Sequence, residues 1–361
     1  MSGLEKKVIK IEELMANKEK ANVVFFNYDN EAYQNTGVQE SGGTPSYAST
    51  TTGPGGEKFP GKIGVKQDLI TPFAFYGAKS LFLATTNPAY PNDLMGKVIE
   101  GMKTNGCAFI QSLSDCMLGW RHPSGNAVEI SKLATDCGYW PLYTIRVKDG
   151  IPKFSYFRGL DIDKEKFMEF LKSMGRFSHL FKPRLLEKEI NEIIHFTEQR
   201  NLKVKALIEK FGSDPSNEIY HINRKKLIPQ THLNPGHGLC MGCGAGMNLF
   251  QLATAATQVA GDNIVYVNST GCIEVSTSKD NVSSWKVNWV HHLFESAPTI
   301  AEAISTTYKI RKAKGLFHGE IPYIIQIGGD GATYDIGFQF LKASIMRTSS
   351  FVEMNEYLTL K

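Results

Sequence analysis

Short apolar runs rich in β-branched and aromatic residues alternate with longer helix-like stretches over most of this 361-residue chain. Two parallel strands must be joined by a long crossover, usually a helix, so this alternation predicts βαβ units and a mostly parallel sheet flanked by helices. The predicted fold class is therefore α/β. The predicted strands are NVVFFNY, SLFLATT, CAFIQSLS, LYTIRV, NIVYVNST and IPYIIQIG. The predicted helices include NDLMGKVIEGMKTN, AVEISKLATDCG, GMNLFQLATAATQVAG, TIAEAISTTYKIRKAKG and GFQFLKASIMR.

The chain divides into two α/β parts joined by a charged connector. Residues 1–185 and 236–361 carry the strand–helix alternation. Residues 186–235 begin with a strongly amphipathic helical stretch, which no strand is expected to follow, and end in a polar, proline-containing segment typical of a linker. The flanks MSGLEKKVIKIEELMANKEK and TSSFVEMNEYLTLK fit no pattern of either part.

Composition narrows the classes of function. An apolar fraction of 42% and a charged fraction of 21% allow a sizeable core. The net charge of +4 is mild and no basic block is interleaved with aromatics, so no nucleic-acid partner is expected. The sequence shows neither a signal-peptide core nor an apolar window long enough to cross a membrane, so we expect a cytoplasmic protein without membrane association.

The predicted strand IPYIIQIG runs into a turn that contains Gly329, Asp330 and Gly331. Glycines allow a tight turn and a close approach of the backbone to a phosphate, and a carboxylate is a suitable ligand for Mg²⁺. Taken alone, the motif is weak, because Gly-Asp-Gly also occurs in ordinary turns at strand ends.

A matching second motif lies near the start of the chain, in YDNEAYQNTGVQ. Asn30 is expected at the end of a strand, and its amide oxygen, together with the carbonyl of Ala32, suits the same cation as Asp330. The two stretches correspond to the two halves of a thiamine diphosphate motif. An ordinary Asn-Gly-type turn would explain NTG but not the pairing of the two motifs.

Cys240 and Cys243 form a C-x-x-C pair at the start of a predicted helix, and Cys272 follows a predicted strand. Three interpretations compete. A zinc site normally needs a second tight pair of ligands, and a thioredoxin-like redox pair needs no third cysteine. An iron–sulfur cluster held by dispersed thiolates needs all three and one more.

Cys116, just past the predicted strand CAFIQSLS, is the best candidate for the fourth thiolate. Cys107 begins that strand and Cys137 lies in a predicted helix, so we expect both to be buried core thiols. The cluster interpretation therefore uses four of the six cysteines.

These motifs together resemble the β subunit of pyruvate:ferredoxin oxidoreductase (pyruvate synthase), of the 2-oxoacid:ferredoxin oxidoreductase family. The resemblance covers most of both α/β parts and implies a thiamine diphosphate-binding fold. It is carried by GHGLCMGCGAG, VNSTGCIEV, SSWKVNWVHHLFESA, IGGDGATYDIGFQ, YDNEAYQNTGVQESGGTP, NPAYP, SLSDCMLGWRHP and CGYWPLYTI.

The order of these stretches differs from that of the family, in which the cysteine pair comes first, then Gly-Asp-Gly, then the asparagine strand and the fourth cysteine. Here the asparagine strand opens the chain and the cysteine pair follows the connector. This order is that of a circularly permuted subunit. Residues 1–185 would be the family's carboxyl-terminal half, residues 186–235 the connector that joins the old termini, and residues 236–361 the amino-terminal half. A composite of two gene copies would give the same order.

The resemblance also implies roles for individual residues. Asp330, the Asn30 side chain and the Ala32 carbonyl would hold Mg²⁺. Gly329 and Gly331 would lie near the diphosphate, Asn35 and Thr36 would face the thiazolium and substrate, and Cys240, Cys243, Cys272 and Cys116 would bind a [4Fe-4S] cluster.

The implied reaction converts pyruvate, CoA and oxidised ferredoxin to acetyl-CoA, CO₂ and reduced ferredoxin. The implied partners are an α-type subunit and a ferredoxin-like subunit or ferredoxin. Glu40 stands where related subunits commonly have an arginine, so another 2-oxo acid stays open as the substrate. Two rival functions also stay open: a cluster-free thiamine-dependent decarboxylase, and a non-catalytic or decayed paralogue that keeps the fold and a structural metal.

Overall fold

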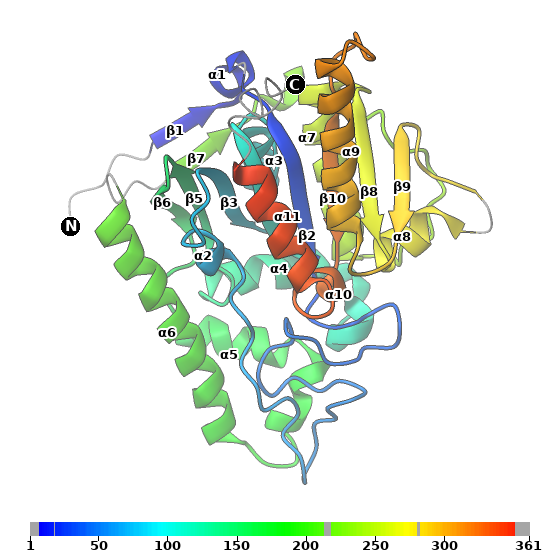
Figure 1. The fold of residues 1–361 in the computed structure, drawn as a ribbon. Coiled ribbons are helices and arrows are strands. Elements are labelled where there is room, and N and C mark those ends of the chain that lie inside the picture. The colour runs from blue at the N-terminus through cyan, green and yellow to red at the C-terminus, as the bar shows by residue number, and fades with distance from the viewer. Residues whose placement is uncertain (1–6, 18, 213–217, 280–281, 351–361) are drawn as a thin grey trace.

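An eight-stranded sheet forms the centre of the molecule in a computed structural model, which describes residues 7–17, 19–212, 218–279 and 282–350 (Figure 1). The strand order is β6-β5-β3-β4-β2-β10-β8-β9. Within the described residues, β5 pairs antiparallel with β3 and β6, and the other neighbours in this sheet are parallel. The strands are β2 (Ala21–Asp29), β3 (Ser80–Thr86), β4 (Gly106–Leu113), β5 (Leu142–Lys148), β6 (Ile151–Arg158), β8 (Ile264–Ser269), β9 (Asn288–His292) and β10 (Tyr323–Gly328).

Strands from both predicted parts of the chain combine in this one sheet. β2, from the first part, pairs with β10, from the last, and Ile325 of β10 stands opposite Val24 of β2. The six predicted strands are confirmed, and β6 and β9 are additional. The mostly parallel α/β sheet predicted from the alternation is therefore confirmed.

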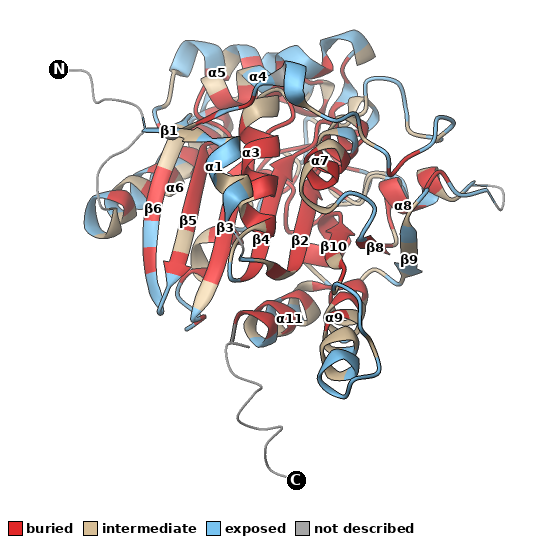
Figure 2. Ribbon diagram, turned by 90° about the horizontal axis from the view of Figure 1, so that it is seen from above, coloured by how far each residue is buried: buried red, intermediate tan, exposed pale blue. Residues whose placement is uncertain are grey.

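Helices cover both faces of the sheet (Figure 2). β2 is buried on both sides: Val24 and Phe26 belong to the core under α3 and α7, and Val23 and Phe25 to the core under α9 and α11. This two-sided burial follows from the period-2 alternation of a strand in a covered parallel sheet. The helices in these layers and at the sheet edges are α2 (Ile70–Phe73), α3 (Pro91–Met102), α4 (Ala127–Asp136), α5 (Lys164–Lys172), α7 (Gly244–Ala260), α8 (Cys272–Thr277), α9 (Ala297–Ala313), α10 (Asp330–Thr333) and α11 (Phe338–Ser350).

The connector folds as a long helix followed by a short strand. Helix α6 (Glu187–Phe211) buries Ile190 and Ile193 against the core that contains α5. Strand β7 (Glu218–His221) then pairs in parallel with β1 (Lys7–Lys10), and α1 (Ile11–Ala16) follows β1. The expectation that no strand follows the connector helix is therefore wrong, because the N-terminal flank supplies a pairing partner that the sequence pattern does not reveal. Residues 1–6 and 351–361 of the two flanks lie outside the described residues.

The end of α11 and the beginning of β2 are neighbours in space. The Asn22 side-chain amide donates a hydrogen bond to the Thr348 carbonyl at 3.1 Å, and the Ser305 hydroxyl of α9 donates to the Asn22 carbonyl at 3.3 Å. The first strand of the large sheet therefore starts where the last described helix ends.

No helix in the described ranges combines the length and the apolar character needed to cross a membrane.

Candidate functional site

The carboxyl ends of β2, β10 and β8 share one edge of the sheet because these strands are parallel neighbours. Asn30 follows the last residue of β2, and Asp330 begins α10 two residues after β10. Ligands of α/β proteins usually bind in the crevice outside this edge. The topology therefore brings the two predicted halves of the site together, although they lie near opposite ends of the sequence.

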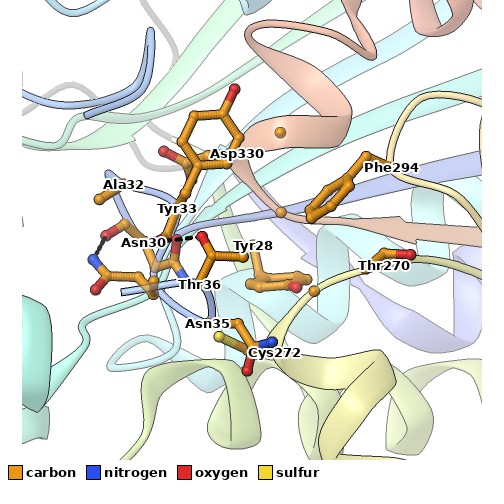
Figure 3. Close-up of a pocket in the computed structure, with 14 residues that line it drawn as sticks. Tyr28, Asn30, Ala32, Tyr33, Asn35, Thr36, Thr270, Cys272, Phe294 and Asp330 are labelled. Carbon is orange, nitrogen blue, oxygen red and sulfur yellow. Dashed lines mark hydrogen bonds between the residues drawn. The ribbon is translucent and has the colours of Figure 1, made fainter. Parts of the chain in front are cut away.

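A pocket at this edge collects every residue predicted for the diphosphate, the cation and the substrate (Figure 3). Its lining also includes Tyr28, Tyr33, Thr270 and Phe294, which the motifs alone do not single out, and Cys272. The predicted residues in the lining are Asn30, Ala32, Asn35, Thr36, Gly329, Asp330 and Gly331.

Three groups that can each present an oxygen converge on one point of this pocket. One terminal atom of the Asn30 amide lies 2.9 Å from the Ala32 carbonyl oxygen and 3.2 Å from Asp330 Oδ1. With nitrogen at that atom, the amide donates two hydrogen bonds. With oxygen there, an amide, a carbonyl and a carboxylate oxygen face one another, which is the donor set that Mg²⁺ prefers. The residues present therefore fit the predicted cation.

The glycines let aromatic rings pack closely against the turn beside this oxygen cluster. A Cβ atom on Gly331 would lie 2.8 Å from the Tyr33 ring and 3.0 Å from the Phe294 ring, and one on Gly329 would lie 3.0 Å from the Tyr28 ring. A side chain at either position would fill the space next to the backbone. These two positions therefore require glycine, and a backbone without side chains is one that a phosphate group can approach closely.

Asp330 is buried and lacks a directly paired cation among the described residues. The Ser41 hydroxyl donates a hydrogen bond to Asp330 Oδ2 at 2.5 Å. Burial, and then the charge of Asp29, raise the pKa of Asp330 well above its usual range, although Lys66 opposes this effect. A divalent cation bound here would supply the missing positive charge.

A buried charge network lies directly beneath the turn that carries Asn30. Lys66 Nζ lies 2.7 Å from Asp29 Oδ2 and 3.0 Å from Glu31 Oε1. Arg176 Nη2 donates to Glu31 Oε2 at 2.6 Å, and the Tyr139 hydroxyl donates to Glu31 Oε1 at 2.5 Å. Burial would raise the pKa of Glu31, but the charges of Lys66 and Arg176 reverse this effect and lower it, so Glu31 stays ionised.

The four predicted cluster cysteines lie at the same end of the molecule. Burial, followed by the charges of Cys116, Cys243 and Cys240, raises the pKa of Cys272 to about 12, so each of these three thiols is near enough to Cys272 to affect its pKa. Helix α7 begins with Gly244, directly after Cys243. The backbone N–H of Gly244 donates a hydrogen bond at 3.0 Å to the carbonyl oxygen of Asp115, the residue before Cys116.

The four thiols lie near one another, but they are not arranged as a set of metal ligands. Within the described residues, no group of three or more His, Cys, Asp or Glu side chains is arranged to hold a metal ion. Cys240 is exposed, and Cys116, Cys243 and Cys272 are partly buried. Cys107 and Cys137 are fully buried in the core, as predicted.

Curated proteins related to this chain are subunits of two 2-oxo acid oxidoreductases. Pyruvate synthase subunit PorB of Thermotoga maritima is 33% identical over 197 residues, which are 54% of this chain and 57% of the relative. Subunit PorB of Pyrococcus horikoshii is 39% identical over 189 residues, covering 48% of this chain and 56% of the relative. Ketoisovalerate oxidoreductase subunit VorB of Pyrococcus furiosus is 32% identical over 192 residues, with coverages of 52% and 58%.

The matches cover only part of each protein. The chain spans just over half the length of these curated relatives. No protein-family model matches the chain. The similarity confirms the resemblance to a 2-oxoacid:ferredoxin oxidoreductase β subunit that the sequence motifs indicate.

Proposed function

We propose that this chain, similar over about half its length to β subunits of 2-oxoacid:ferredoxin oxidoreductases, binds thiamine diphosphate through Mg²⁺ and carries a [4Fe-4S] cluster. With an α-type subunit and a ferredoxin-like subunit or ferredoxin, it would convert pyruvate and CoA to acetyl-CoA and CO₂, and the two electrons released would reduce ferredoxin. The observation that carries this proposal is the convergence of Asn30, Ala32 and Asp330 at the carboxyl edge of the sheet.

Each part of the pocket has a definable task in this function. Asp330 Oδ1, the Asn30 amide oxygen and the Ala32 carbonyl would hold the cation, and the Gly329–Gly331 turn would admit the diphosphate. Thiamine diphosphate, when bound, supplies the carbanion chemistry that decarboxylates a 2-oxo acid. The exposed residues Asn35 and Thr36, which also line the pocket, would orient the substrate.

The position of the cysteines supports electron transfer from the same pocket. Cys272 lines the pocket together with Asp330, and its pKa responds to Cys116, Cys243 and Cys240. A cluster held by these four thiolates would stand beside the cofactor site, as one-electron transfer to an iron–sulfur centre requires. A cluster-free decarboxylase would have no use for this grouping.

Cofactor binding by the isolated chain provides the first test. We expect Mg²⁺ with thiamine diphosphate to raise the melting temperature of the anaerobically purified protein, because a ligand that binds only the folded state stabilises it. Neither component alone should give the full increase, and a chelator should reverse it. A melting temperature unchanged by both components together would rule out the proposed diphosphate site.

The reaction itself needs the partner subunits. Protein co-purified from the native host should reduce methyl viologen with a 2-oxo acid and CoA, and the rates with pyruvate and 2-ketoisovalerate would identify the substrate. Glu40, the residue that leaves the choice of substrate open, is not among the residues that line the pocket. Its charge acts on Lys62: burial lowers the pKa of Lys62, and the negative charge of Glu40 opposes this effect. Iron–sulfur protein without viologen reduction by any 2-oxo acid would favour the non-catalytic rival.

We also attribute the segment order to a circular permutation. The two parts pair as β2 and β10 in one sheet, and Asn22 bonds to Thr348, so the family's order requires only a short link between these points. A comparison that follows chain order matches a permuted relative over one part at a time, which agrees with coverage of about half.

Restoring the family's order tests this attribution. A reordered chain, residues 222–350 followed by a short Gly-Ser link and residues 20–212, should fold cooperatively, because it keeps all eight strands of the large sheet. We expect its affinity for Mg²⁺ with thiamine diphosphate to stay within about tenfold of the original, since the edge that carries the site is unaltered. Calorimetric titration of both proteins gives the comparison. An insoluble or non-binding reordered chain would argue for the composite-gene origin.

A further inference from the structure

The turn that carries the cation ligands presents them on one side and a buried glutamate on the other. Asn30 and Ala32 line the pocket, whereas Glu31 between them is only 1% exposed and enters the charge network. Glu31 has a φ of 66°, a left-handed conformation that is costly for a residue with a side chain. Such a conformation persists only where the surroundings fix it, so the contacts of Glu31 determine where its two neighbours point.

Arg176 is one of the residues that hold the Glu31 carboxylate. It is 2% exposed, donates to Glu31 Oε2 at 2.6 Å and stacks its guanidinium 4.0 Å from the ring centre of Trp120. Arginine suits this double role because its planar group can pair with a carboxylate and lie on an aromatic face at once.

Trp120 links Arg176 to the turn that carries the predicted cation ligands. Its indole N–H donates to the Asn30 carbonyl at 3.1 Å, and the Gln34 side chain donates to the same oxygen at 2.8 Å. Trp120 is fully buried and follows Cys116 by one turn, with its backbone N–H bonded to the Cys116 carbonyl at 2.7 Å. Arg176 therefore contacts, directly or through Trp120, two consecutive residues of the turn.

We propose that Arg176 is a positioning residue for the cation, acting through Glu31 on the backbone of the turn and through Trp120 on Asn30. This role rests on the proposed function, because it presupposes that a divalent cation binds at Asn30 and Asp330. Arg176 is not one of the described residues that line the pocket, and no sequence motif marks it. It differs from a general stabilising residue in that its loss alters cation affinity in protein that is still folded.

The test compares Mn²⁺ affinity with thermal stability. Free Mn²⁺ is measured by electron paramagnetic resonance in the presence of thiamine diphosphate, and unfolding is followed by calorimetry. We expect Arg176→Met to weaken Mn²⁺ binding by about 10- to 100-fold, the range found when residues that orient metal ligands are replaced. Arg176→Lys, which keeps the charge but loses the planar group, should recover only part of the affinity.

Lys97→Met provides the matched control. Lys97 is also a fully buried cation, but it belongs to α3, where it pairs with Asp93 at 2.7 Å and donates to the Thr85 carbonyl at 2.8 Å. This variant should lower the melting temperature and leave Mn²⁺ affinity unchanged. If Arg176→Met behaves like Lys97→Met, with lower stability and normal affinity, the role of Arg176 is structural only and the proposal is wrong.

Trp120→Phe keeps the proposal testable if Arg176→Met does not fold. It removes the N–H that bonds to Asn30 but retains an aromatic ring for Arg176, and we expect a severalfold loss of Mn²⁺ affinity. Normal affinity in this variant would overturn the path through Trp120. Absence of Mn²⁺ binding in the unaltered protein is a separate result, because it would refute the cation site itself and with it the proposed function.

Discussion

Replacing Asp330 with asparagine is expected to abolish Mg²⁺-dependent binding of thiamine diphosphate while raising the melting temperature of the cofactor-free protein. The loss of binding follows from removing the one carboxylate of the oxygen cluster, and we expect roughly a 100-fold or greater decrease in affinity for a hard cation. Asparagine preserves the shape of the side chain and its hydrogen bond with Ser41, so the fold should survive.

The gain in stability follows from the sign of the pKa shift. The pKa of Asp330 is higher in the folded protein than in the unfolded chain, first because of burial and then because of Asp29. Its contribution to stability is therefore greatest below the unfolded pKa and is lost as the pH rises through the folded pKa. Near neutral pH an ionised Asp330 is unfavourable unless a cation is bound, and asparagine removes this penalty.

Calorimetric unfolding between pH 5 and 8, with and without Mg²⁺ and thiamine diphosphate, measures both effects. Asp163→Asn, a substitution at the exposed N-cap of α5, is the control and should leave cofactor binding unchanged. If Asp330→Asn still binds the cofactor normally, the diphosphate site lies elsewhere. If its melting temperature falls in the absence of cofactor, the carboxylate is already compensated within the chain.

The second large effect is expected from Cys272→Ser, which should remove the iron from the protein. Anaerobically purified chain should contain about four irons and equivalent sulfide, and the variant should contain almost none, because a hydroxyl is a poor substitute for a thiolate ligand. Iron and sulfide analysis, with the visible absorbance of thiolate-bound iron, gives the result.

Cys137→Ser is the matched control for this substitution. Cys137 is fully buried in the core at the end of α4, so its replacement should reduce stability without changing the iron content. Stoichiometric zinc or no metal in the unaltered protein would contradict the cluster, and so would full iron retention in Cys272→Ser.

Sequence reasoning predicts the elements that bear a local signal. Apolar runs identify β2, β4, β8 and β10, and the parallel order of such strands places Asn30 and Asp330 at one edge. β6 is harder to recognise because a proline and two basic residues interrupt its apolar pattern, and β9 because it is a short edge strand with only partial burial.

The residues that support the site escape prediction for a different reason. Lys66 comes from a loop and Arg176 from a short 3-10 helix, Gly175–Leu180, and both lie outside the two motifs. Their role at the site follows only from the fold, which brings each of them to Glu31. A single charged residue outside the long helices and the sheet is normally solvated, so nothing local distinguishes these two from other basic residues of the chain. The one indication is that Glu31 is buried in the middle of a turn, because a buried carboxylate needs basic side chains beside it to balance its charge.

The pairing of β2 with β10 has a consequence for biosynthesis. β2 is made near the start of this chain, whereas β10, its partner at the centre of the sheet, is made near the end. On the ribosome, β2 can pair with β4 early, but its other edge stays open until β10 has been made. The nascent protein therefore exposes one apolar edge of β2 until β10 emerges, and we expect its yield in the cell to depend on the supply of chaperones.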